Sequence, residues 1–320
     1  MRLEFAARVA CWAHDRSPGG DVAAMAPAAI AAGRRPYGGH PLARWAAGPM
    51  QRGVRVTDRL VPTDAVELPI RVYTPARPAT GPRPVVLRFH GGGWVVGNPC
   101  SADWFCSGVA LAADAVVISA GYRLAPEHRA PTAALDAFAL LQALTGPSAE
   151  PGTDPTRVAV AGESAGGNLA AVVALLARDA GGPALAGQAL LYPAVDGTLS
   201  SPSIDRLHDA PGLNRSDVRA FLAHYLGPHG DPRDPRVSPL LAADHRGLPP
   251  ALIQTAEHDP LLDDGSRYTR VLREAGVPVR YTRYLGAPHG FYSMPRLTRI
   301  AAQARDEVAA FLAEVLAPPT

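Results

Sequence analysis

One short segment, Gly162–Gly166 (GESAG), constrains the fold more than any other part of the sequence. It follows Arg157–Ala161, which predicts a strand, and it opens Gly166–Asp179, which predicts a helix. A chain that turns this sharply crowds its own backbone, so glycine is needed two residues before and two residues after the serine. The turn lifts the Ser164 hydroxyl to the carboxyl edge of a sheet. It also sets the Ala165 amide at a helix N-terminus, where it can donate to a developing negative charge.

The rest of the hydrophobic pattern predicts strands that alternate with helices. Continuous apolar strands separated by helices indicate a largely parallel sheet covered on both faces, and the first two strands suggest an antiparallel edge. The predicted strands are Val54–Val61, Glu67–Tyr73, Pro84–His90, Ala115–Ala120, Arg157–Ala161, Ala186–Tyr192, Ala251–Thr255 and Val279–Tyr284. The predicted helices are Ser101–Ala113, Pro131–Leu144, Gly166–Asp179, Asp264–Ala275 and Leu297–Leu316.

A polar segment at about residues 196–248 interrupts this alternation. It is rich in Asp, Arg, His and Pro, and it contains one amphipathic stretch, Arg215–Leu226. We expect residues 51–320 to form one catalytic domain, with residues 1–50 and this insert together forming a helical cap above the sheet. The alternative is that the insert is an ordinary long surface loop.

A second motif, His90–Trp94 (HGGGW), comes directly after a predicted strand. Three consecutive glycines leave the main-chain amides unshielded, so a substrate oxygen can approach them closely. A flexible loop or a phosphate cradle would also be rich in glycine. Neither of the usual phosphate-binding patterns accompanies this one, and a binding site for an oxyanion is therefore favoured.

A serine nucleophile needs a base, and His289 is the histidine in the right place. The base needs a carboxylate to orient it, and for this kind of turn the chain order is serine, acid, histidine. His289 lies in a loop after the last predicted strand, whereas His229 and His245 lie in the insert and His258 directly precedes the acid candidate.

The acid is expected just past the strand Ala251–Thr255. Asp259 lies in the loop that follows this strand, and Glu257 is the alternative acid. Asp263 and Asp264 are expected instead to cap and begin the next helix.

The composition excludes several classes of protein. The formal net charge is only +2, from 31 basic and 29 acidic residues, which gives no reason to expect nucleic acid or an anionic membrane as partner. The chain has no lysine, so Schiff-base chemistry and a Ser-Lys dyad are excluded. Its three cysteines match no metal or redox spacing, and no apolar run is long enough to span a bilayer. The N-terminal residues do not resemble a signal peptide, and we expect a soluble, cytoplasmic protein.

Taken together, HGGGW, YRLAPEH (Tyr122–His128), GESAGG, HDPLLDDG and HGF occur in the order found in the bacterial hormone-sensitive lipase family of esterases. The chain resembles this family from about Val54 to its C-terminus. The resemblance implies an α/β-hydrolase fold, a catalytic triad of Ser164, Asp259 and His289, and a cap built from an N-terminal region plus an insert. It also implies an oxyanion hole formed by the amides of Gly92, Gly93 and Ala165, with His90 and Gly91 supporting the loop. The chain departs from the family at Glu163, where aspartate is more usual.

We therefore expect a serine carboxylesterase that acts on small-molecule esters with short or medium acyl groups and needs no metal or organic cofactor. Trp94, Phe221 and Tyr225 are candidates for lining its substrate site, and ordinary core packing is the alternative for each. A deacetylase or tailoring hydrolase of a specialised metabolite would use the same residues. A non-catalytic small-molecule-binding protein on a hydrolase scaffold is the alternative from a different class, and a homodimer is left open.

Overall fold

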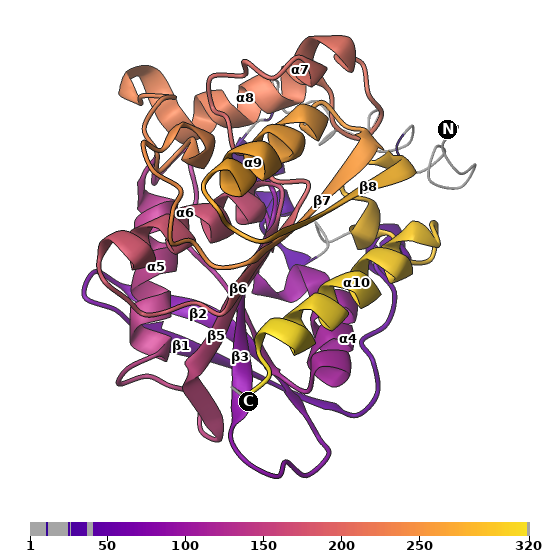
Figure 1. The fold of residues 1–320 in the computed structure, drawn as a ribbon. Coiled ribbons are helices and arrows are strands. Elements are labelled where there is room, and N and C mark those ends of the chain that lie inside the picture. Colours follow the sequence, from indigo (N-terminus) through magenta and orange to yellow (C-terminus); the bar gives the residue numbers. More distant parts are fainter. Residues whose placement is uncertain (1–10, 12–24, 26, 37–40, 319–320) are drawn as a thin grey trace.

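The computed structural model of the chain describes residues 11, 25, 27–36 and 41–318. An eight-stranded sheet in the order β1-β2-β4-β3-β5-β6-β7-β8 runs through the molecule (Figure 1). Strands β1 and β2 pair antiparallel with each other, β2 pairs antiparallel with β4, and every other neighbouring pair is parallel. The strands are β1 (Val54–Pro62), β2 (Glu67–Pro75), β3 (Arg83–Phe89), β4 (Val116–Ala120), β5 (Thr153–Glu163), β6 (Gly187–Leu191), β7 (Ala251–His258) and β8 (Val279–Pro288).

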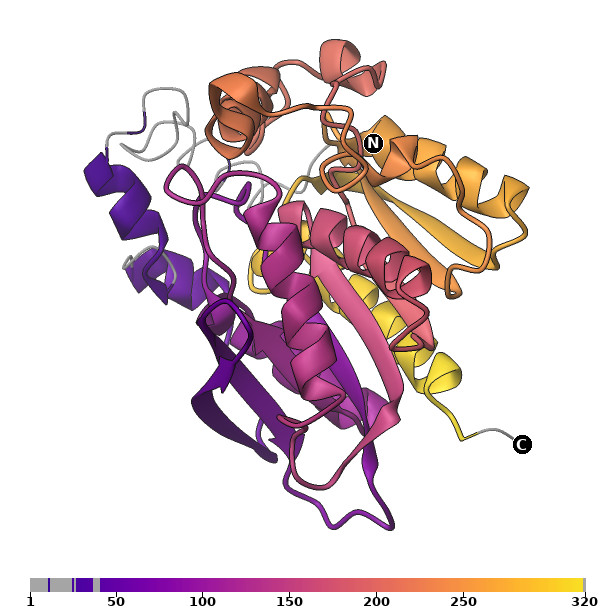
Figure 2. The same ribbon diagram turned by 90° about the vertical axis from the view of Figure 1, so that its left-hand side faces the viewer.

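Helices cover both faces of this sheet, and the α/β-hydrolase fold expected from the sequence is confirmed. Helices α4 and α10 pack on one face, and α5, α6 and α9 pack on the other (Figures 1 and 2). Strands β3, β4 and β6 are buried along their whole length, because helices lie over both of their faces. The helices are α4 (Asp103–Ala113), α5 (Thr132–Leu144), α6 (Ala165–Asp179), α9 (Leu262–Glu274) and α10 (Ile300–Val315).

The predicted elements differ from these mainly at their ends. The helix expected over Ser101–Ala113 is divided into a 3-10 turn, η3 (Pro99–Ala102), and α4. The Asn98 side chain caps the turn by accepting a hydrogen bond from the Cys100 amide, so the chain tightens before the α-helix begins.

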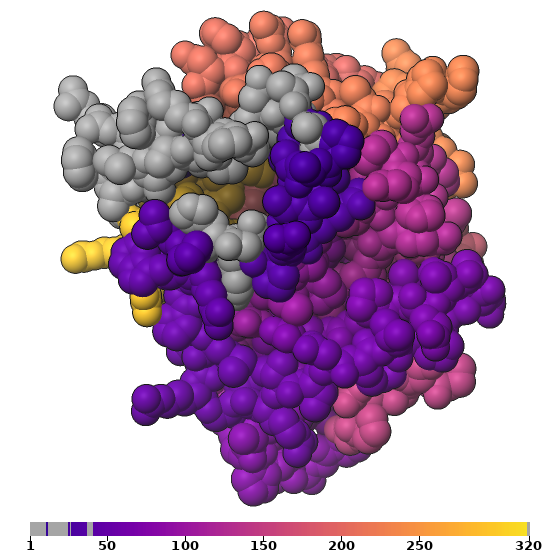
Figure 3. Space-filling view, turned by 180° about the vertical axis from the view of Figure 1, so that it is seen from behind, coloured from indigo at the N-terminus to yellow at the C-terminus, as the bar shows by residue number. Residues whose placement is uncertain are grey.

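The insert, residues 196–248, crosses the carboxyl edge of the sheet. It contains α7 (Ser203–Arg206), α8 (Arg215–Leu226), η4 (Gly227–His229) and η5 (Pro239–Leu241), and α8 coincides with the predicted amphipathic stretch. Two N-terminal helices, α2 (Pro27–Gly33) and α3 (Pro41–Ala46), lie toward the same end of the molecule (Figures 2 and 3). Most of residues 1–24, which the sequence assigned to a cap, lie outside the described residues. Among the described helices, none is both long and apolar enough to cross a bilayer.

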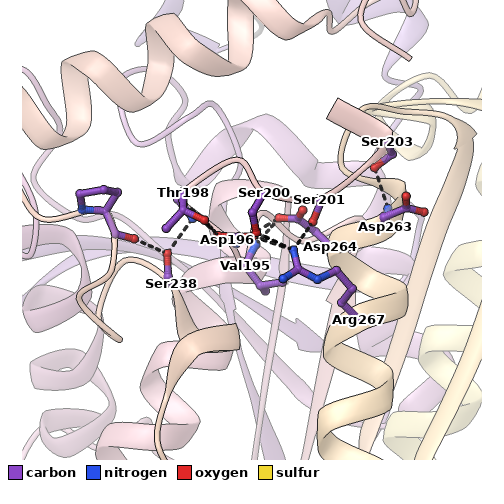
Figure 4. Close-up of polar contacts among 12 residues, drawn as sticks. Val195, Asp196, Thr198, Ser200, Ser201, Ser203, Ser238, Asp263, Asp264 and Arg267 are labelled. Atoms are coloured by element: carbon purple, nitrogen blue, oxygen red, sulfur yellow. Dashed lines mark hydrogen bonds and ion pairs between the residues drawn. The ribbon is translucent and has the colours of Figure 1, made fainter. Parts of the chain in front are cut away.

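A buried polar cluster anchors the insert where it leaves β6 (Figure 4). The Asp264 carboxylate on α9 accepts hydrogen bonds from the amides of Val195 (2.9 Å) and Asp196 (3.1 Å). Asp196 accepts in turn from the hydroxyls of Thr198 and Ser200 and from the Arg267 guanidinium at 2.7 Å. Asp264 was expected to begin a helix. It does lie in the first turn of α9, but its side chain binds the root of the insert and is 1% exposed.

The pKa values of the two carboxyl groups in this cluster, Asp264 and Asp196, are shifted in opposite directions. Burial raises the pKa of Asp264 to about 7, and the neighbouring charge of Asp196 acts in the same direction against the hydrogen bonds that lower it. Burial would also raise the pKa of Asp196, but hydrogen bonds from Ser200, Thr198 and Arg267 outweigh it and lower the pKa. The cluster therefore favours one proton on Asp264 beside an ionised Asp196.

This arrangement predicts a dependence of folding stability on pH. The folded-state pKa of Asp264 lies above the ordinary value of 3.8, so between about pH 4 and 7 the folded protein holds a proton that the unfolded chain has lost. The stabilisation that this proton gives the folded state is complete below about pH 4 and is lost as the pH rises through 7. Between these values the free energy of unfolding falls by up to about 1.4 kcal/mol per pH unit. Asp264→Asn mimics the neutral acid and should remove this slope. Urea unfolding of both proteins from pH 5 to 8 measures it.

The matched control is Ser203→Ala, which removes a buried hydroxyl that donates to the Pro260 carbonyl without removing a titratable group. It should keep the wild-type slope. If the difference in unfolding free energy between wild type and Asp264→Asn is the same at every pH, the assignment of the proton to Asp264 is wrong.

Candidate active site

Ser164 lies on a strained turn between β5 and α6, as predicted. Its backbone φ is 56°, in the left-handed region that side chains other than glycine rarely adopt. The Ser164 amide donates to the Leu191 carbonyl at 2.9 Å, which ties the turn to β6. A side chain at Gly162 would overlap the backbone of Gly166, so the first glycine of the motif is required by close approach within the turn.

Three side chains from separate loops form a hydrogen-bonded chain with Ser164 at its end. Asp259 Oδ2 lies 2.7 Å from His289 Nδ1, and His289 Nε2 lies 3.0 Å from Ser164 Oγ. Since a carboxylate only accepts, we assign the proton of the neutral histidine to Nδ1, which leaves Nε2 free to accept from the serine hydroxyl. The ring of Tyr192 meets His289 edge-on, with the ring centroids 4.8 Å apart.

Asp259, which directly follows β7, is the acid in this series of hydrogen bonds. Its carboxylate is fully buried, and Oδ1 accepts a further hydrogen bond from the Leu261 amide at 2.8 Å. The alternative acid, Glu257, instead accepts from the Gly286 amide at 2.7 Å and supports the loop before His289. Asp263 binds Arg206 of the insert. Of the carboxylates weighed in the sequence, Asp259 is the one whose oxygen contacts His289.

The glycine loop, residues 90–97, passes beside Ser164 after β3. Gly92 and Gly93 both have positive φ, +113° and +59°. Among the described residues, the amides of Gly92 and Gly93 have no hydrogen-bond acceptor, and Ala165, as the first residue of α6, has none within its helix. Gly92, Gly93 and Ala165 all line the same cavity as Ser164.

His90 and Tyr122 pack against each other at the start of this loop. The two rings stack with centroids 4.3 Å apart, and the Tyr122 hydroxyl donates to the His90 carbonyl at 2.7 Å. Burial lowers the pKa of His90 to about 3. The imidazole is therefore neutral, and its Nδ1 donates to the Gly91 carbonyl at 2.8 Å.

Glu163, the residue that departs from the family pattern, forms a buried ion pair with Arg88 of β3. Its Oε1 also accepts from the Gly91 amide at 2.7 Å. Arg88 donates further to the hydroxyls of Ser119 (2.9 Å) and Tyr292 (3.0 Å). Arg88 and its contacts were not found from the sequence, although a single arginine inside the apolar strand PVVLRF is itself a sign of a buried partner.

A cavity of about 270 Å³ opens at Ser164 and His289. Besides these two, its walls include the glycine loop and a largely apolar group of side chains, Trp94, Leu199, Leu213, Val218, Phe221, Leu222 and Leu261. Trp94 and Phe221 thus line the cavity, as expected. Tyr225 does not: its fully buried ring stacks on Trp94, with the centroids 4.4 Å apart and the planes inclined by 5°.

Within the described part of the chain, no group of three or more His, Cys, Asp or Glu side chains is placed to hold a metal ion.

Comparison with known proteins agrees with this geometry. Residues 86–293 match the model of a family described as the alpha/beta hydrolase fold. The chain belongs to this family. Carboxylesterase NlhH of Mycobacterium tuberculosis is 44% identical over 257 residues, which cover 78% of this chain and 80% of the relative. Ethyl acetate hydrolase of Pseudomonas putida is 38% identical, with 73% of this chain and 74% of the relative covered.

A solved esterase structure also superimposes on this chain over nearly its whole length. The hyperthermophilic esterase from the archaeon Pyrobaculum calidifontis is 33% identical and superimposes with a TM-score of 0.89, covering 99% of this chain and 100% of that one. These esterase relatives confirm the resemblance to the hormone-sensitive lipase family that the motifs indicated.

Proposed function

We propose that this protein is a serine carboxylesterase that works through an acyl-enzyme on Ser164. The observation that carries the proposal is the series of hydrogen bonds from Asp259 through His289 to Ser164, in the wall of a largely apolar cavity. The relatives named as carboxylesterase, ethyl acetate hydrolase and esterase support the same reaction.

In the proposed first half-reaction, Ser164 Oγ attacks the ester carbonyl carbon while His289 Nε2 takes the hydroxyl proton. The carbonyl oxygen becomes an oxyanion and is stabilised by the amides of Gly92, Gly93 and Ala165. Asp259 keeps the imidazole in the required tautomer and stabilises its positive charge. The tetrahedral intermediate then collapses, and the alcohol leaves with the proton that His289 returns to it.

In the second half-reaction, water takes the place of the alcohol. His289 removes a proton from the water, which attacks the acyl carbon, and a second oxyanion forms among the same amides. Collapse returns the proton to Ser164 Oγ and releases the carboxylic acid. Apart from the ester and this water, the groups used in these steps are side chains and main-chain amides of this chain.

We also propose that the insert, with the N-terminal region, forms a cap that covers the site. The insert supplies much of the apolar wall of the cavity, including Leu199, Leu213 and Phe221. In the described part of the chain, Cys100 and Cys106 form no disulfide bond, which suits a reducing compartment, and a cytoplasmic enzyme is part of the same proposal.

The first test is Ser164→Ala. Turnover of a nitrophenyl ester should fall by about six orders of magnitude, because the covalent step loses its nucleophile. A fluorophosphonate probe should label the wild type and not the variant. Ester turnover or probe labelling that persists in Ser164→Ala would show that another residue is the nucleophile.

The second test separates the two acids that the sequence offered. Asp259→Asn should lower kcat by about 10⁴-fold, because an amide at this position favours the wrong tautomer of His289. Glu257→Gln is the matched control: it keeps an acceptor for the Gly286 amide and should leave kcat within about twofold of wild type. The reverse order of activities would assign the acid to Glu257.

The third test concerns the substrate range, for which we propose short or medium acyl groups. Each buried CH₂ should contribute up to about 0.8 kcal/mol until the acyl chain outgrows the cavity of about 270 Å³. We expect kcat/KM for nitrophenyl esters to be highest between acetyl and octanoyl. A steady rise up to palmitoyl would contradict this range. No turnover, with Ser164 still reactive toward the probe, would indicate a single specialised substrate.

A further inference from the structure

Helix α8 of the insert rests directly on the glycine loop. Phe221 lies against Gly93 so closely that a side chain at Gly93 would overlap its ring. Tyr225, one turn later on the same helix face, stacks flat on Trp94. Two side chains of one helix turn therefore contact two successive residues of the loop.

The loop needs such support at Trp94. Gly92, Gly93 and Trp94 have φ values of +113°, +59° and +61°. Glycine adopts these angles freely, but for a tryptophan the left-handed conformation is strained and persists only where the surroundings hold it. The Trp94 carbonyl accepts a hydrogen bond from the Ala125 amide at 2.9 Å.

The contact between the two rings is one of packing alone. Among the described residues, neither Trp94 Nε1 nor the Tyr225 hydroxyl has a hydrogen-bond partner. Tyr225 is fully buried and Trp94 is 5% exposed. What Tyr225 supplies to Trp94 is therefore a flat, rigid surface, which phenylalanine would also supply and an aliphatic side chain would not.

The far half of the glycine loop is held differently. Arg34, at the end of α2, donates from Nε to the Val95 carbonyl at 3.1 Å, and the Gly97 amide donates to the Gly33 carbonyl at 3.1 Å. These contacts lie beyond Trp94, whereas Gly92 and Gly93, which line the cavity with Ser164, lie before it. In the first half, Glu163 binds the Gly91 amide, and the Gly92 carbonyl accepts from the Val95 and Val96 amides at 3.1 and 3.0 Å. The side-chain packing on Gly93 and Trp94 comes from α8.

We propose that Tyr225 is a positioning residue for the oxyanion hole: by stacking on Trp94 it holds the loop in the turn that aims the amides of Gly92 and Gly93 at the reacting carbonyl. The proposal rests on the proposed esterase function. It gives α8 two tasks, because the same helix lines the cavity with Val218, Phe221 and Leu222. A bulky substrate that displaces α8 would disturb the oxyanion hole and would therefore have a lower kcat.

The experiment compares Tyr225→Leu with Tyr225→Phe on a short nitrophenyl ester. Tyr225→Leu should lose about 10- to 100-fold in kcat with KM within about twofold of wild type. This loss is at or below the 10²–10³-fold that removal of an oxyanion donor costs. Tyr225→Phe should restore kcat to within about twofold of wild type. The inhibition constant of a trifluoromethyl ketone, which forms a charged tetrahedral adduct, should rise in parallel with the loss of kcat.

A double mutant shows whether Tyr225 acts through Trp94. If it does, Trp94→Leu/Tyr225→Leu should be no slower than Trp94→Leu alone, because the contact is already lost. Additive losses in kcat would overturn the proposal.

Leu226→Ala is the matched control. Leu226 is the neighbouring residue on α8, is half-buried against the core, and does not line the cavity. Its loss should lower the melting temperature and leave kcat unchanged. An equal fall of kcat in Leu226→Ala would show a merely structural role for the helix. A rise in KM with unchanged kcat in Tyr225→Leu would show that Tyr225 forms part of the substrate wall. Either result overturns the proposal.

If Tyr225→Leu does not fold, Tyr225→Met retains an apolar side chain of similar length and should show the same split between kcat and KM. Failure of the esterase proposal would look different from failure of the Tyr225 proposal. In that case the wild type would lack ester turnover, or Ser164→Ala would retain it.

Discussion

The buried ion pair between Arg88 and Glu163 joins the parts on which the site depends. Arg88 comes from β3, just before the glycine loop, and Glu163 directly precedes Ser164. Through the Gly91 amide and the Tyr292 hydroxyl, the pair also binds the glycine loop and the segment after His289. Removing one partner of such a pair leaves an uncompensated buried charge, at a cost of about 3–5 kcal/mol, so the two residues have to be kept or replaced together. The longer side chain of Glu163 is part of this arrangement, since its carboxylate reaches both Arg88 and Gly91.

The features that the sequence predicted well are those with a local cause. The turn at Ser164 follows from glycines at fixed offsets between an apolar strand and a helix. Asp259 and His289 could be selected because each directly follows a strand of a parallel sheet, whose carboxyl ends meet at one edge. The amphipathic stretch Arg215–Leu226 was recognised from its periodicity alone.

The features that the sequence did not reveal depend on contacts between distant segments. Nothing near Asp264 indicates that its side chain binds the root of the insert, because its position after Asp263 looks like an ordinary helix start. Tyr225 was a candidate for lining the substrate site, with core packing as the alternative, and its ring packs behind Trp94. Periodicity identifies that face, and it does not distinguish the residues at a cavity wall from those one layer behind it. For most of residues 1–24, no comparison between prediction and structure can be made.

The separation of the site residues along the chain has a consequence for how activity arises during folding. Ser164 and His289 are 125 positions apart, and Arg88 and Tyr292 are 204 positions apart. Contacts across such distances close large loops and form late, after local helices and neighbouring strands. A refolding chain therefore regains helical content before it regains a competent serine. If His289 is the base, as we propose, a chain on the ribosome stays inactive until the segment that carries His289 has emerged and docked on the sheet.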